Sequence, residues 1–172
     1  MKNRLLAALL ISLFAAGPAL AETRYWAFDA ADRVTQALTR GITLEIDRGF
    51  FGGISVRTIH STSNRGRAVI RRGGPDAVWR ALPEGASERA VYTISTDQGD
   101  GRGLSRALCP GAEETWLVLG RVQQGREVTI HAVGVWLDGT YRPCVKLSYT
   151  YRGEWSALPR SNDIPEPSPG AR

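Results

Sequence analysis

The chain has 172 residues, and its 22 basic and 17 acidic side chains give a formal net charge of +5 at pH 7. This small excess does not predict nucleic-acid binding. Hydrophobic residues make up 42% of the chain and glycine occupies 19 positions, which indicates a globular, loop-rich protein and excludes a disordered one. The length is sufficient for one domain with a substantial hydrophobic core.

The first 21 residues have the organisation of a secretory signal peptide. Two basic residues in the first four positions precede an apolar run at 5–14, and small residues stand at Ala19 and Ala21. The run is shorter than the roughly 20 residues that cross a bilayer. No later segment approaches that length, so we expect no transmembrane anchor. We expect cleavage near Ala21 and a periplasmic or secreted protein that begins at Glu22.

Residues 29–41 are the best candidate for an α-helix. Asp29 can cap its first turn, Gly41 can end it, and apolar residues recur between them at helical spacing. Three aromatic residues just before this segment are expected to pack onto the core: Tyr25, Trp26 and Phe28.

After residue 41 the apolar residues alternate with polar ones, which is typical of strands with one buried face. The predicted strands are residues 42–46, 54–56, 68–70, 90–96, 116–122, 127–137 and 145–151. Short helical turns are expected at 75–82 and 104–108. The sequence thus predicts a mostly β domain over 22–158, with one or two short helices, and a flexible, proline-rich tail over 159–172. The regular spacing of short strands favours a sandwich or a curled, barrel-like antiparallel sheet.

The last two strands are predicted to form a hairpin around a two-residue Asp-Gly turn at 138–139. This turn pairs Ala132 with Val145 and places apolar residues along one face of the hairpin. On the other face it pairs Val133 with Cys144. Because that second face is apolar near the turn, we expect the loop before the strand at 116–122 to cover it.

The two cysteines, Cys109 and Cys144, are predicted to form a disulfide, because an even cysteine count in an exported protein is typical of one. Neither cysteine has a histidine or a second cysteine near it in the sequence, so they do not indicate a catalytic thiol. No H-x-x-x-H or C-x-x-C spacing occurs. The sequence therefore predicts no metal and no cofactor.

The two histidines, His60 and His131, are the candidate catalytic bases. Ser61 follows His60, but adjacent residues of a strand point to opposite faces, and no G-x-S-x-G occurs. His131 is expected to be a half-exposed partner of Lys146. These features favour a protein without enzymatic activity, although a hydrolase that uses His60 or His131 with a distant acid is left open.

Two groups of residues are candidates for ligand binding. The densest basic group comprises Arg65, Arg67, Arg71 and Arg72. It suits an anionic partner, and it equally suits the solvated edge of a strand. Tyr151 and Trp155 are both odd-numbered, so they share one parity and would lie on the same face of a regular strand. They are candidates for an exposed aromatic platform. The Gly-Phe-Phe-Gly-Gly segment at 49–53 is interpreted as a loop packed into the core, with an apolar contact tip as the alternative.

These features together predict an exported, non-enzymatic binding or interaction protein of the bacterial-type cell envelope. Its expected partner is an envelope protein or an anionic envelope component. One alternative is a carbohydrate- or cell-wall-binding module that uses the exposed aromatic residues, and the other is the hydrolase.

Overall fold

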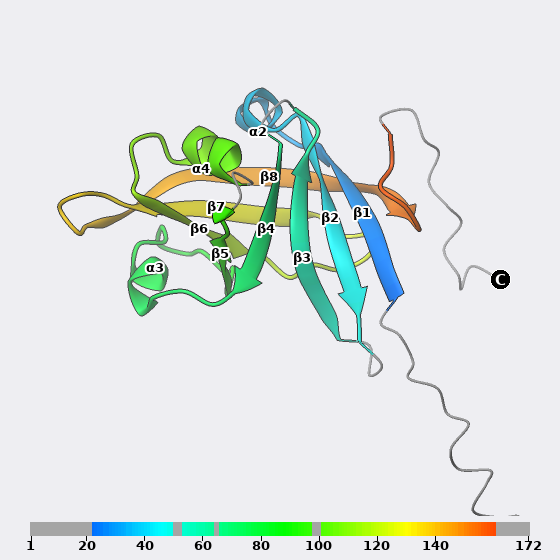
Figure 1. Ribbon diagram of the computed structural model, residues 1–172, viewed down its shortest axis with the longest axis horizontal. Helices are drawn as coiled ribbons and strands as arrows, with labels where there is room; N and C mark the ends of the chain where they lie inside the picture. Colours follow the sequence, from blue (N-terminus) through cyan, green and yellow to red (C-terminus); the bar gives the residue numbers. More distant parts are fainter. Residues whose placement is uncertain (1–21, 50–52, 64–65, 98–100, 161–172) are drawn as a thin grey trace, which may run out of the picture.

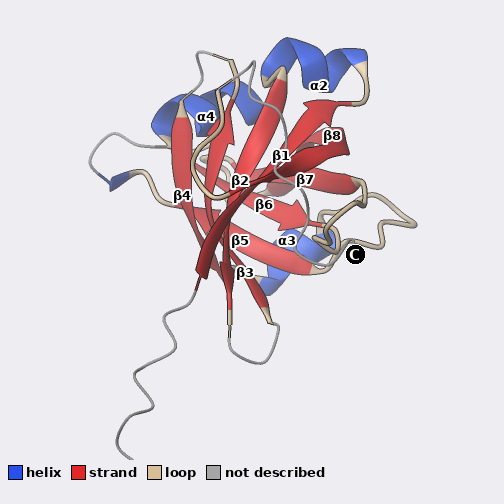
Figure 2. Cartoon of the chain, turned by 90° about the vertical axis from the view of Figure 1, so that its right-hand side faces the viewer, coloured by secondary structure: helices blue, strands red, loops and turns tan. Residues whose placement is uncertain are grey.

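The computed structural model describes residues 22–49, 53–63, 66–97 and 101–160. In these residues the chain forms β1 (Glu22–Ala30), α2 (Arg33–Leu38), β2 (Gly41–Arg48), β3 (Ile54–Ser61), β4 (Arg67–Arg72), α3 (Asp76–Arg80), β5 (Ala90–Ile94), α4 (Arg102–Leu108), β6 (Glu114–Leu119), β7 (Val128–Val135) and β8 (Tyr141–Trp155). Each strand pairs with the next, and β8 pairs with β1 (Figure 1). The result is a closed antiparallel barrel, whose strands curve around one core (Figure 2).

Two architectures were predicted, a sandwich and a curled, barrel-like sheet, and the sandwich is wrong. The sheet closes into a barrel, because the chain has a strand that the sequence interpretation missed. This strand, β1, contains the three aromatic residues that were expected only to pack onto the core. It pairs with β2 on one side and with β8 on the other. A strand with partners on both sides joins the two edges of an otherwise open sheet. The mostly β class and the disulfide are confirmed, and the described residues contain three short helices rather than the predicted one or two.

The first helix is shorter than predicted, and its cap is a different residue. β1 continues to Ala30, so Asp29 belongs to the strand. The side chain of Asp32 caps α2, because its Oδ1 accepts a hydrogen bond from the backbone N–H of Thr35 at 2.8 Å. The hydrogen bonds from Thr35 hold the pKa of Asp32 below its ordinary value. No helix in the described ranges is long and apolar enough to cross a membrane.

Side chains fill the barrel interior. Alternate residues of each strand point inward, and Phe28 and Leu44 are no more than 1% exposed. Leu104 and Leu108 of α4 pack against the same core. The void between these leucines and the strands is about 10 Å³, which is no larger than one water molecule requires. This part of the interior is therefore packed rather than open to a ligand.

β7 and β8 form the predicted hairpin, but its turn is one residue longer than predicted. Gly139 donates its backbone N–H to the carbonyl of Trp136 at 2.8 Å and has a φ of 72°. The backbone N–H of Trp136 donates to the carbonyl of Thr140 at 3.1 Å. The loop is thus residues 137–139, with glycine in the left-handed conformation.

A β-bulge restores the predicted register farther from this turn. Val133 faces Pro143, and not Cys144 as predicted, whereas Ala132 faces Val145 as predicted. Cys144 is the additional residue of the bulge. Proline has no N–H for the ladder, so a bulge is a favourable place for Pro143.

The predicted disulfide joins Cys109 to Cys144, with a Cα–Cα distance of 5.3 Å. Cys109 follows α4 and is 1% exposed within the main core. Cys144 packs against that same core. The disulfide therefore fastens α4 to β8 over the barrel interior, rather than fastening a loop over the second face as predicted.

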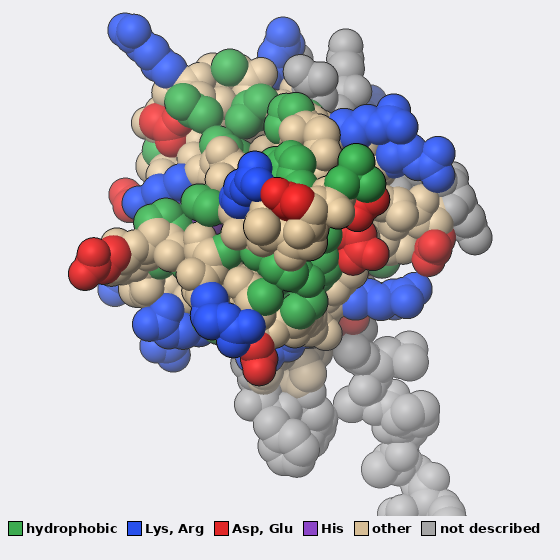
Figure 3. Space-filling model, turned by 90° about the vertical axis from the view of Figure 1, so that its left-hand side faces the viewer, with side chains coloured by type: hydrophobic (Ala, Val, Ile, Leu, Met, Phe, Trp, Pro, Cys, Tyr) green, Lys and Arg blue, Asp and Glu red, His purple; other side chains and the backbone are tan. Residues whose placement is uncertain are grey.

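The outer face of β5–β7 carries a second apolar cluster. Trp116 faces Val133 in the register, and both are buried. The cover is the segment 73–89, which contains α3, and not the predicted loop before β6. Val78 of α3 is fully buried against this cluster. On the same side of the molecule, apolar side chains lie among basic and acidic ones (Figure 3), and Leu137 of the hairpin tip is 88% exposed.

Candidate functional site

Charged residues point into one end of the barrel. On β1, Arg24 has the same inward-facing parity as Trp26, and on β2, Arg48 ends the inward-facing series of residues. On β8, Glu154 lies directly opposite Trp26. We call this end, formed by Arg24, Arg48, Glu154 and the β6–β7 loop at 120–127, the barrel mouth.

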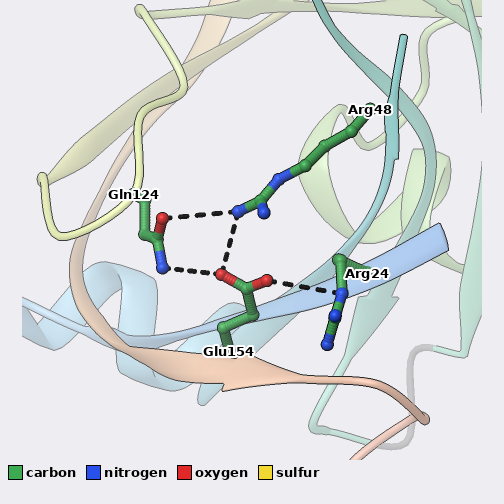
Figure 4. A network of polar contacts seen from close by, with 4 residues as sticks. All are labelled: Arg24, Arg48, Gln124 and Glu154. Carbon is green, nitrogen blue, oxygen red and sulfur yellow. Dashed lines mark hydrogen bonds and ion pairs between the residues drawn. The ribbon is translucent and has the colours of Figure 1, made fainter. Parts of the chain in front are cut away.

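Glu154 is the centre of a network of polar contacts (Figure 4). Its Oε2 accepts hydrogen bonds from Arg48 Nη2 at 3.0 Å and from Gln124 Nε2 at 2.7 Å. Its Oε1 lies 3.7 Å from Nε of Arg24. Arg48 Nη2 also donates to Oε1 of Gln124 at 3.3 Å. The carboxylate is thus held by two guanidinium groups and one amide.

The burial of this network indicates a functional role. The Glu154 side chain is 2% exposed, and those of Arg24 and Arg48 are 16% and 28% exposed. Removal of charges from water costs several kcal/mol per ion, and well-packed apolar residues in their place are often as stable or more stable. Positions where a sequence departs from the most stable choice are expected to be functional or strained sites. The barrel mouth is therefore the candidate site.

A cleft of about 440 Å³ opens at the barrel mouth. Its lining comprises Trp26, Arg48, Ile54, Gln123, Gln124 and Arg126. These side chains offer guanidinium, amide and indole donors, and none of the described lining residues is a carboxylate. The volume lies within the range of roughly 300–1,000 Å³ that is usual for small-molecule sites. The cleft suits a ligand group that accepts hydrogen bonds and carries negative charge.

Trp26 connects the barrel core to this cleft. The residue is 1% exposed, and the Arg48 guanidinium lies 5.6 Å from its ring centroid. Its Nε1 is buried and has no hydrogen-bond acceptor among the described residues. A buried donor without an acceptor is costly and rare, so this indole is a further polar group without a partner at the barrel mouth.

The β6–β7 loop positions Gln124 over the barrel mouth. A turn forms at 123–126, where the backbone N–H of Arg126 donates to the carbonyl of Gln123 at 3.2 Å. Gly125 has a φ of 73°, a conformation that glycine adopts without strain. The turn therefore brings Gln124 and Arg126 to the cleft from outside the sheet.

No protein-family model, curated protein or solved structure matches this chain. The candidate site therefore rests on the contacts of the chain itself. The sequence interpretation missed its charged members. Arg24 and Arg48 continue the parity of the buried residues on their strands, and this parity is the signal that could have identified them. Glu154 does not continue the parity of Leu147 and Tyr149, because a bulge shifts the register between β1 and β8, so alternation along β8 could not have identified it.

The predicted basic group is divided between the two faces of β4. Arg67 and Arg71 have the outward-facing parity, whereas Arg72 has the parity of buried Ile70 and faces Tyr92. All three arginines are exposed, and Arg65 lies outside the described residues, as do Phe50 and Phe51. The group is therefore not one continuous surface of β4, and its role in binding stays a prediction.

Tyr151 and Trp155 do not form the exposed platform that the carbohydrate-binding alternative requires. Trp155 is 5% exposed. The Tyr151 ring packs edge-on against Trp26 and Phe28, with centroid distances of 6.3 and 5.5 Å. Burial, with a smaller contribution from Glu154, raises the pKa of Tyr151. Tyr151 is thus partly buried and packs against the core beneath the barrel mouth.

Neither histidine lines the cleft at the barrel mouth. His131 faces Lys146 in the register, but it is buried rather than half-exposed, because the segment 73–89 covers it. Its Nε2 lies 3.2 Å from the Glu88 carboxylate. His60 Nε2 lies 3.8 Å from the Glu45 carboxylate, which exceeds hydrogen-bond distance. The described part of the chain has no group of three His, Cys, Asp or Glu side chains that could hold a metal ion.

Proposed function

We propose that the protein is an exported, non-enzymatic binding protein of the bacterial-type cell envelope, and that the barrel mouth binds a carboxylate-bearing envelope component. The observation that carries the proposal is the donor-lined cleft beside the buried Glu154 network. The signal-peptide organisation of the first 21 residues supports export. The disulfide is compatible with an oxidising compartment.

The lining of the cleft favours a carboxylate over a more highly charged anion. The guanidinium groups of Arg48 and Arg126 match the planar, two-oxygen geometry of a carboxylate. Glu154 already neutralises part of the charge at Arg48, so a singly charged ligand group fits the remaining charge better than a polyanion does. Ile54 adds an apolar wall for the body of the ligand.

The same lining favours binding over catalysis. None of its described side chains is a nucleophile or a general base. The nearby carboxylate of Glu154 is bonded to Arg48 and Gln124, so it orients these donors rather than facing a ligand alone.

Calorimetric titration of the mature protein, residues 22–172, with two matched pairs of sugars tests the ligand class. The acids are galacturonate and N-acetylmuramate, and their neutral matches are galactose and N-acetylglucosamine. We expect at least one acid to bind about tenfold more tightly than its neutral match, which corresponds to about 1.4 kcal/mol. If neither acid binds, or if acid and neutral sugar bind equally, the proposed ligand class is wrong.

Two variants locate the binding. Arg126→Gln removes a guanidinium from the cleft without removing a contact of Glu154, and it should weaken acid binding about tenfold. Arg142→Gln is the matched control, because its guanidinium lies in the β7–β8 hairpin against Trp136 and Asp138. Equal affinity in both variants would place the binding elsewhere.

A further inference from the structure

A second cleft, of about 410 Å³, lies along β1–β3 and shares no lining residue with the barrel mouth. Thr43 of β2 and His60 of β3 are neighbours in the register, and both line it. They face away from the core because the residues next to them, such as Leu44 and Ile59, face inward. The cleft therefore belongs to the outer surface of the barrel.

Positive charge predominates in this cleft. Arg67, Arg152 and Arg160 line it, and Asp29 is the single carboxylate among its described lining residues. Arg67 belongs to β4 and Arg152 to β8, and these strands flank β1–β3 on opposite sides of the barrel sheet. Guanidinium groups thus approach the cleft from both flanks, with His60 on a strand between them.

His60 lines the cleft and can be a further donor when its imidazole is protonated. Its Nε2 is buried and makes no hydrogen bond to any described residue. The nearest carboxylate, Glu45, is 3.8 Å away. Burial, and to a smaller extent the charge of Arg67, lowers the pKa of His60, while Glu45 acts in the opposite direction. An anion in the cleft would add a second negative charge near the imidazole and favour its protonated form.

We propose that this cleft is a binding site for a phosphate-type anion, with Arg67 and Arg152 as flanking donors and His60 as a donor between them. The lining has three arginines against one aspartate, which favours a group with more than one negative charge, such as a phosphate of about −1.5 to −2. A phosphate also accepts hydrogen bonds in several directions, which suits donors on separate strands better than a planar carboxylate does. Free phosphate and a phosphate ester on a sugar share this chemistry.

The test is an NMR titration of the two histidine C2–H resonances of the mature protein at constant ionic strength. The protein is titrated with inorganic phosphate, with glucose 1-phosphate and with galacturonate. We expect the pKa of His60 to rise on addition of phosphate or its ester, in a saturable manner. His131 is an internal control, because it is buried against Glu88 and does not line the cleft. If glucose 1-phosphate binds more tightly than inorganic phosphate, the ligand of the cleft is a phosphorylated sugar. If inorganic phosphate binds more tightly, the ligand is free phosphate.

Variants make the test specific to this cleft. Arg67→Gln and Arg152→Gln should each reduce the affinity for phosphate at least about tenfold, measured from the phosphate-induced change at His60. Arg71→Gln should not, because Arg71 is an exposed arginine of the same strand as Arg67 that does not line the cleft. The proposal is overturned if phosphate leaves His60 unchanged, if galacturonate is as effective, or if all three variants respond alike.

Discussion

Glu154 shows most clearly how single residues define the site. Its position opposite Trp26 in the barrel directs a carboxylate inward, where an apolar side chain is expected. Two hydrogen bonds and a neighbouring guanidinium compensate for its burial. The residue therefore holds Arg48 and Gln124 in the positions from which they line the cleft.

Glu154→Gln should destabilise the protein because it leaves two guanidinium groups close together without a counter-charge. Removal of one partner of a fully buried pair costs about 3–5 kcal/mol. Because the Arg48 side chain is 28% exposed, we expect a smaller loss, of about 2 kcal/mol. Urea unfolding measures the free energy of unfolding, and Asp138→Asn is the control because the Asp138–Arg142 pair is exposed. Equal losses in both variants would show that the Glu154 network contributes no more than a surface pair.

His60 should make stability depend on pH. Its pKa in the folded protein lies below the ordinary value of 6.5, because burial disfavours the charged imidazole. The unfolded chain therefore binds more protons between these two pKa values. The contribution of His60 to the free energy of unfolding is fully present above about pH 6.5. It is lost as the pH falls from there through the lowered pKa of the folded protein. In a buffer without phosphate, His60→Gln should lose less stability than wild type between pH 7 and 5. Parallel curves for the two proteins would contradict this account.

At the scale of elements, alternation along the chain predicted the strands well, and their partners less well. The pairs of β6 with β7, and the far half of the β7–β8 hairpin, follow from parity alone. The tip of that hairpin does not, because Gly139 supports a three-residue loop and the bulge at Cys144 then corrects the register. β1 was missed because Arg24 stands at an inward-facing position, where its charge interrupts the apolar pattern.

The start of α4 depends on Gly101. This residue has a φ of 77°, and a Cβ atom here would lie 2.3 Å from the carbonyl oxygen of Ser95. Gly101→Ala should therefore cost about 3 kcal/mol or more, from backbone strain together with the clash. Gly85→Ala is the matched control, because Gly85 has a φ of 81° and open space around it. It should cost only about 1 kcal/mol. Thermal unfolding compares the two variants, and equal shifts would show that the clash is relieved without cost.

At the scale of the whole molecule, barrel closure and packing decide where a ligand can bind. Closure leaves no unpaired edge strand among the eight described strands. The interior beneath α4 is filled by leucine and isoleucine side chains and by Tyr149. Ligands are therefore expected at the barrel mouth and in the outer cleft. Neither location could be predicted from the sequence, because both combine residues that are far apart in the chain and meet only on closure.

Export is also a property of the whole chain. The organisation of the first 21 residues predicts a periplasmic or secreted protein that is cleaved near Ala21, and expression in a Gram-negative host tests this. Intact mass of the periplasmic fraction should give a chain that begins at Glu22 and is about two hydrogen masses lighter than its reduced form, because of the disulfide. Uncleaved protein in the cytoplasm would contradict the proposed export.

The central claim, that the barrel mouth binds a carboxylate, is tested most directly by the indole N–H resonances of the tryptophans in an NMR titration with galacturonate and N-acetylmuramate. Trp26 lines the cleft, whereas Trp136 lies in the β7–β8 hairpin beside Arg142. We predict that at least one acid shifts the Trp26 resonance saturably and leaves that of Trp136 unchanged, and that Arg126→Gln weakens this effect about tenfold. An unchanged Trp26 resonance at saturating concentrations of both acids, or equal shifts of both tryptophans, would contradict the claim.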